Sequence, residues 1–99
     1  MNVYLLPSDF DKSGPENEKV YFDIIREVKK FITIPVSLKV GYYFSSLAQM
    51  ALKLSETGIA GLTLFNRPYN PDIDLLNLQI DAKNMFSSDN EYSHSLRWV

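Results

Sequence analysis

The feature that most constrains the fold is an apolar run from Ile32 to Val40, in which Lys39 is the only charged residue. The second half of this run, residues 36–40, lies between Pro35 and Gly41. A run of this kind predicts a strand buried on both faces, as in parallel sheets covered by helices. Ligands of parallel sheets bind beyond the carboxyl ends of the strands, so Lys39, near that end, is a candidate site residue.

Two further segments predict strands that carry a polar residue. The segment 61–65 is apolar apart from Thr63 and is followed by Asn66, and the chain opens with the segment 2–6, which begins with Asn2. We expect Asn2, Lys39 and Asn66 to face one pocket. Simpler interpretations remain open: Lys39 as an ordinary strand-end lysine, Asn66 as a turn former and Asn2 as part of a frayed end.

A helix is predicted from Pro15, which suits the first helical position. Ser13 and Glu16 have the spacing of a capping box, with Gly14 as the alternative cap. The apolar stripe expected to face the core has helical spacing. It comprises Val20, Tyr21, Ile24, Ile25, Val28 and Phe31.

A second helix is predicted after Ser45 or Ser46, either of which is a suitable N-cap. Gly58 is placed to end this helix in the left-handed conformation. The buried stripe of the helix is expected to consist of Leu47, Met50, Ala51 and Leu54. The order strand, helix, strand, helix, strand predicts parallel pairing through right-handed crossovers, which is α/β architecture with the helices outside.

The pattern weakens after Asn66. Two prolines make the segment 67–72 a predicted loop, the segment 73–80 is expected to be a short irregular strand or hairpin arm, and 87–99 a loop entering one more helix. We therefore expect a single domain over residues 1–99, with an irregular tail over 67–99.

Composition excludes several functions. Ninety-nine residues with 45% hydrophobic content allow one small domain, and the net charge of −2 without a basic stripe argues against nucleic acid as a partner. The chain has no cysteine and one histidine, His94, so thiolate and multi-histidine metal sites are excluded. No apolar run approaches the roughly 18 residues of a membrane-spanning helix, and no signal peptide is evident. We expect a cytoplasmic protein that does not bind membranes or metals.

Other candidate groups have ordinary explanations. Asp9, Asp11, Asp72 and Asp74 could be paired carboxylates for acid–base or metal chemistry, but loop aspartates more often cap turns. The aromatic segment 42–44 could stack on a flavin or a nucleobase, although packing is the commoner role.

The joint order of several sequence strings resembles the central part of a dihydroorotate dehydrogenase-like protein. These strings are the opening strand at Asn2, Leu38-Lys39, Leu64-Phe65-Asn66-Arg67 followed by Tyr69-Asn70-Pro71-Asp72-Ile73-Asp74, and the closing Leu96-Arg97-Trp98. The resemblance spans nearly the whole chain. It implies a flavin mononucleotide (FMN) oxidoreductase of pyrimidine synthesis, built on a (β/α)₈ or TIM barrel.

The resemblance also implies roles for particular residues. Lys39 would contact the flavin ring, and Asn2 and Asn66 would hydrogen-bond the small-molecule substrate. The family places its proton-abstracting cysteine or serine after the first of these strands, where this chain has Leu5-Leu6-Pro7-Ser8, so no catalytic residue is assigned. Ser8 is nearby but out of register.

A complete (β/α)₈ barrel needs about 250 residues. We therefore expect a partial barrel of about three parallel strands and two crossover helices, inactive by itself. The alternative is a stand-alone, non-catalytic α/β module that acts by association. Open sheet edges predict a homo-oligomer, with Leu62 and Leu64 of an apolar inner face buried between copies.

Overall fold

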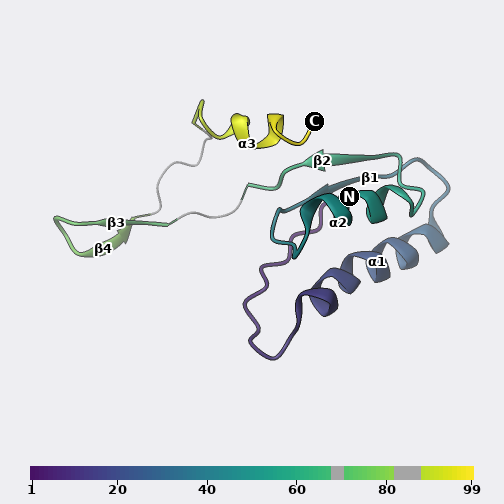
Figure 1. The fold of residues 1–99 in the computed structure, drawn as a ribbon, viewed down its shortest axis with the longest axis horizontal. Coiled ribbons are helices and arrows are strands. Elements are labelled where there is room, and N and C mark those ends of the chain that lie inside the picture. Colours follow the sequence, from purple (N-terminus) through teal and green to yellow (C-terminus); the bar gives the residue numbers. More distant parts are fainter. Residues whose placement is uncertain (68–70, 82–87) are drawn as a thin grey trace. The chain divides into compact units, whose positions relative to one another are not determined.

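The computed structural model describes residues 1–67, 71–81 and 88–99, which form two compact units, Met1–Asn66 and Arg67–Val99 (Figure 1). The first unit contains the helices and strands that the sequence predicts most clearly. In chain order these are α1 (Gly14–Phe31), β1 (Ser37–Val40), α2 (Leu47–Ser55) and β2 (Gly61–Leu64). The fold is mixed α/β with a small parallel sheet.

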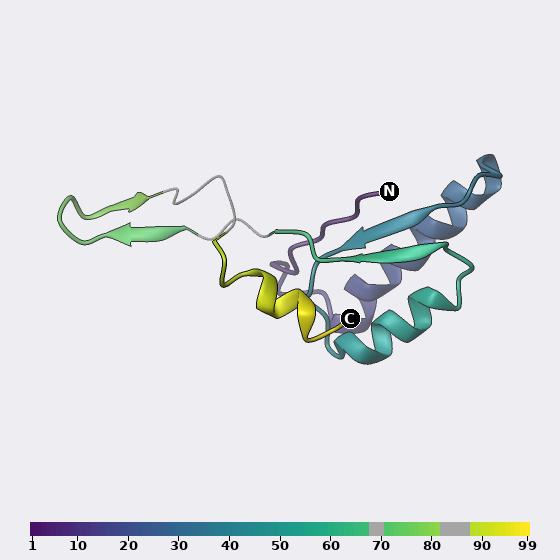
Figure 2. The same ribbon diagram turned by 90° about the horizontal axis from the view of Figure 1, so that it is seen from above.

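The sheet of the first unit is parallel. β1 pairs with β2 in the register Ser37↔Gly61 to Val40↔Leu64, and the N-terminal segment lies along the other edge of β1 (Figure 2). That segment makes a single parallel bridge, Asn2↔Lys39, so the expected third strand is reduced to one bridge. Backbone hydrogen bonds from Val3 N to Lys39 O (3.0 Å) and from Lys39 N to Met1 O (2.8 Å) hold it in place.

Both helices cover one face of this sheet, as Figure 1 shows. The core between helices and sheet consists of Val3, Tyr21, Ile25, Leu38, Val40, Met50 and Leu54. Leu62 and Leu64 pair in register with Leu38 and Val40 and pack against the same core. Their assignment to an apolar inner face is therefore wrong, because they belong to the helix-covered face.

The expectation that β1 is buried on both faces is also wrong. Its residues alternate, with Leu38 and Val40 buried and Ser37 and Lys39 exposed. Within Met1–Asn66, all of which the structure describes, no helix covers the face that carries Ser37, Lys39 and Thr63. We call this the open face, and it is polar where the sequence predicted apolar side chains.

Helix α1 begins as predicted. Ser13 is the N-cap, and the carboxylate of Glu16 accepts hydrogen bonds from the Ser13 backbone N–H (2.8 Å) and hydroxyl (2.6 Å). Tyr21 and Ile25 are buried, but Val20 and Phe31 are exposed. Phe31 is the last helical residue, where the chain turns away toward β1 and leaves no core for its ring to enter.

Helix α2 has Ser46 as its N-cap and buries Met50 and Leu54, with Leu47 and Ala51 half-buried, as the apolar spacing predicts. Gly58 adopts φ 76°, a conformation that favours glycine. Ala60 N then donates to Val36 O at 2.8 Å, which sets the start of β2.

The second unit has more regular structure than the expected irregular tail. β3 (Asp72–Asp74) and β4 (Gln79–Asp81) form an antiparallel hairpin, which confirms the hairpin alternative, and α3 (Tyr92–Leu96) is a short helix. Arg67 and Glu91 form a two-bond ion pair. The predicted features at residues 68–70 and at Ser87 lie outside the described residues. Among the helices described, none is long and apolar enough to cross a membrane.

Candidate functional site

The two asparagines predicted as site residues are hydrogen-bonded to each other. Nδ2 of Asn66 donates to Oδ1 of Asn2 at 2.6 Å and to the backbone oxygen of Val3 at 3.1 Å. The backbone N–H of Asn66 donates to Val40 O at 2.6 Å, which anchors the residue beyond the end of β1. Asn66 is only 7% exposed, and it is the one buried polar side chain among the described residues.

Lys39 adjoins this pair through the sheet. Asn2 and Lys39 are bridge partners, and Lys39 is in turn the partner of Thr63 on β2. Paired residues of neighbouring strands project from the same face and lie about 5 Å apart. Asn2, Lys39 and Asn66 therefore lie near one another toward the carboxyl end of the sheet, and the expectation that they face one pocket stays a prediction.

Sequence reasoning missed two hydroxyl groups on the open face. The Ser37 hydroxyl donates to Gly61 O at 3.3 Å and lies 3.5 Å from Oγ1 of Thr63. Ser37 precedes Lys39 by two residues in β1, and Thr63 is the partner of Lys39 in β2. Strict alternation in Ser37-Leu38-Lys39-Val40 is the signal that could have found them, because it places Ser37 and Lys39 on one face. The lysine is thus set among neutral hydrogen-bonding groups.

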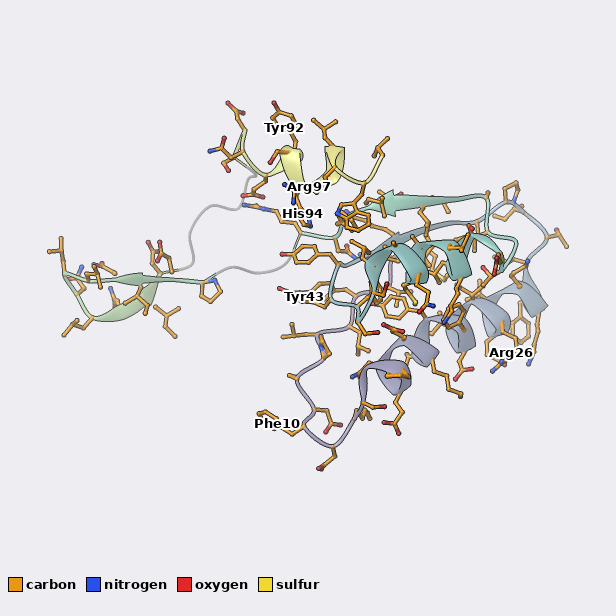
Figure 3. The ribbon with its side chains drawn as sticks, in the orientation of Figure 1. Phe10, Arg26, Tyr43, Tyr92, His94 and Arg97 are labelled. Carbon is orange, nitrogen blue, oxygen red and sulfur yellow. The ribbon has the colours of Figure 1, made fainter. Side chains whose placement is uncertain are left out.

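Aromatic side chains of the loop between β1 and α2 mainly pack against other aromatic rings of the first unit. Phe44 meets Tyr21 edge-on with ring centroids 5.2 Å apart, and Tyr42 meets Phe65 at 5.8 Å. Tyr21 also accepts a hydrogen bond from Leu5 N at 3.3 Å, and burial raises the pKa of its phenol. Tyr43 is more exposed and projects from this loop (Figure 3). The simpler prediction of packing therefore holds for Phe44.

The loop and hairpin aspartates accept local hydrogen bonds. Asp9 accepts from Asp11 N, and Asp74 accepts from Leu76 N, Asn77 N and the Asn77 side chain, which lowers the pKa of Asp74. No cluster of three potential metal ligands occurs among the described residues. Phe10, between Asp9 and Asp11, points away from the protein (Figure 3).

Two cavities of the first unit have linings that do not include Asn2, Lys39 or Asn66. The amino-end cavity, of about 270 Å³, lies between the last turns of α1 and the segments 32–36 and 58–60. The other, of about 370 Å³, lies between the start of α1 and the β1–α2 loop. Ligands of parallel α/β sheets bind at the carboxyl ends of the strands, so the amino-end cavity is the weaker candidate.

The side chains at this site are of the kind that contact polar ligands. Lys39 supplies a cation, and each asparagine side chain carries both donor and acceptor groups. Both N–H groups of Asn66 Nδ2 are used in holding Asn2 and Val3, so the interaction with Asn2 fixes the orientation of the amide planes before any ligand arrives. No family model, curated protein or solved structure matches this chain.

Proposed function

We propose that this chain forms the central section of a dihydroorotate dehydrogenase-like, FMN-dependent (β/α)₈ barrel, with Asn2, Lys39 and Asn66 as its ligand-contacting residues. The single observation that carries the proposal is the convergence of these residues at the carboxyl end of one parallel sheet. Asn2 and Asn66 are 64 positions apart in the sequence but are hydrogen-bonded to each other. They lie toward the carboxyl end of the sheet, which is the end where (β/α)₈ barrels bind their ligands.

The topology supports a barrel section. The N-terminal segment, β1 and β2 lie in sequence order, and both connecting helices cover the same face. In doubly wound sheets the strand order reverses and helices cover both faces, whereas in a (β/α)₈ barrel successive strands are neighbours and all helices lie outside. The open face then corresponds to the barrel interior, and Lys39 and Thr63 on it lie toward the carboxyl ends of β1 and β2, where ligands of such barrels bind.

The side chains fit the ring portion of a flavin and a small ring substrate. Bound FMN would supply the hydride acceptor for oxidation of a C–H bond in the substrate. The Lys39 ammonium would favour negative charge developing on the flavin ring, and the Asn2–Asn66 pair would orient the substrate through amide hydrogen bonds. Leu5 packs against the core and Leu6 is an exposed apolar residue, so no proton-abstracting base is assigned.

The proposal predicts weak flavin binding and no dihydroorotate oxidation by this chain alone. Barrels of this class hold the flavin phosphate on loops after the last two strands, whereas the resemblance assigns this chain to the middle of the barrel. We expect a dissociation constant on the order of 1 mM, and FMN that is lost on desalting.

An NMR titration of the isotope-labelled chain with FMN tests this proposal. Backbone and side-chain amide shifts should localise to Asn2, Lys39 and Asn66. The variant Lys39→Ala should weaken binding about tenfold, while Lys53→Ala, which removes a cation from α2, should leave it unchanged. Shifts elsewhere, or equal affinity in both variants, would overturn the proposal.

The alternative is a non-catalytic module that acts by association. It is favoured by the outer edge of β2, which has no partner strand within Met1–Asn66. A self-associating chain with no response to FMN would support this alternative.

A further inference from the structure

Tyr4 occupies a defined position on the open face. Val3 is buried and Leu5 packs against the core, so the alternation of an extended segment places Asn2 and Tyr4 on the opposite side. Tyr4 is 43% exposed, although it is a large aromatic residue next to a core position. It therefore shares a face with Asn2 and Lys39.

Gly41 leaves room for the Tyr4 ring. A Cβ atom at Gly41 would lie 3.5 Å from both Cδ2 and Cε2 of Tyr4, so the ring rests against the backbone of the residue that follows β1. Gly41 is two residues beyond Lys39 and is buried. Because residues two apart in an extended chain share a face and lie about 7 Å apart, the ring and the Lys39 side chain are neighbours.

We propose that Tyr4 forms an aromatic wall of the candidate site and makes it select planar, conjugated ring acids over saturated ones. The inference rests on the proposed function, because it deepens the assignment of the same site. A flat ring can stack on the exposed part of the tyrosine while its carboxylate and amide edge hydrogen-bond to the Asn2–Asn66 pair. A puckered, saturated ring with the same carboxylate loses the stacking contact but keeps these hydrogen bonds.

Orotate and dihydroorotate are suitable probes, because they share a carboxylate and differ in ring planarity. In NMR titrations the unaltered chain should bind orotate at least about fivefold more tightly than dihydroorotate, the low end of the effect of stacking a ring on an aromatic side chain. Orotate should also shift the ring resonances of Tyr4, a readout that needs no substitution.

Two variants and a control separate stacking from other effects. Tyr4→Phe keeps the ring and should keep the preference, whereas Tyr4→Leu should abolish it and leave dihydroorotate affinity within about twofold. Tyr43→Leu, which removes another exposed tyrosine near the end of β1, should change neither affinity. Far-UV circular dichroism establishes that each variant is folded.

The outcomes separate this inference from the proposed function. If Tyr4→Leu keeps the orotate preference while Lys39→Ala weakens FMN binding, the aromatic wall is wrong and the proposed function stands. If FMN binds independently of Lys39 but the preference for orotate depends on Tyr4, the proposed function fails and the wall stands. If neither ring acid nor FMN binds the unaltered chain at 20 mM, a concentration about twentyfold above the dissociation constant expected for FMN, both are overturned.

Discussion

Asn66 donates a hydrogen bond from Nδ2 to Oδ1 of Asn2 at 2.6 Å, which joins the end of β2 to the beginning of the chain. The same nitrogen donates to Val3 O, so one buried amide also satisfies a backbone acceptor on the N-terminal segment. This segment makes only one bridge to β1. The Asn66 side chain is therefore both a site residue and a support for the strand beside Lys39.

Replacing Asn66 should destabilise the first unit. Asn66→Ala removes both side-chain bonds and leaves the buried Val3 carbonyl without this donor, at a cost of about 1–3 kcal/mol. Asn2→Ala removes only the exposed partner and should cost about 0.5–1 kcal/mol. Urea unfolding followed by far-UV circular dichroism measures both, since most helical residues belong to α1 and α2. Equal effects for the two variants would contradict this structural role of Asn66.

The Ser13–Glu16 cap should make stability depend on acid pH. Hydrogen bonds from the Ser13 hydroxyl and backbone N–H lower the pKa of Glu16 from 4.5. Because the folded-state pKa is the lower one, the contribution is present above about pH 4.5 and is lost as the pH falls through the folded-state value. Glu16→Gln should show a smaller loss of stability below this pH than the unaltered chain in urea titrations. Parallel pH profiles for the two proteins would show that the cap does not contribute.

Much of this fold was predictable because local signals and packing agree. Ser13 and Glu16 form the predicted capping box, Gly58 has the positive φ that glycine tolerates, and the apolar stripe of α2 is largely buried as its spacing predicts. The meeting of Asn66 with Asn2 followed from a general rule about the carboxyl ends of parallel strands. Such rules need only the order of the elements, which the sequence shows clearly.

Errors arose where burial depends on neighbours that the sequence does not show. The apolar run before Gly41 predicts a strand buried on both faces, but in β1 the exposed Ser37 and Lys39 alternate with the two buried residues. Phe31 continues the stripe of α1 but lies at the helix end, beyond the core. Tyr4 was overlooked because its role depends on Gly41, a contact between residues far apart in sequence.

Self-association should occur through the outer edge of β2 and not through an apolar inner face. Lys39 uses its backbone N–H and C=O to bond the N-terminal segment, so Leu38 and Val40 turn theirs toward β2. The parallel register then turns the backbone groups of Gly61 and Thr63 toward β1 and the N–H groups of Leu62 and Leu64 to the outer edge. An unpaired edge of this kind favours pairing with a second copy.

Sedimentation velocity at micromolar concentrations measures this association. The chain should sediment as a dimer or larger species, and Leu62→Pro, which removes an edge donor, should shift it toward the monomer, while Leu62→Ala, which loses the same side-chain packing but keeps the N–H, should not. A stable 11.4 kDa monomer over the whole concentration range would contradict the edge-pairing account.

The most direct test of the proposed site is to locate bound orotate by intermolecular nuclear Overhauser effects on the labelled chain. The amino-end cavity near Ile34 provides an internal comparison, because it lies at the opposite end of the sheet. Our account predicts contacts from the ring proton of orotate to the side-chain amide of Asn66 and to the side chain of Lys39. Contacts confined to the amino-end cavity, or none at saturating orotate, would contradict it.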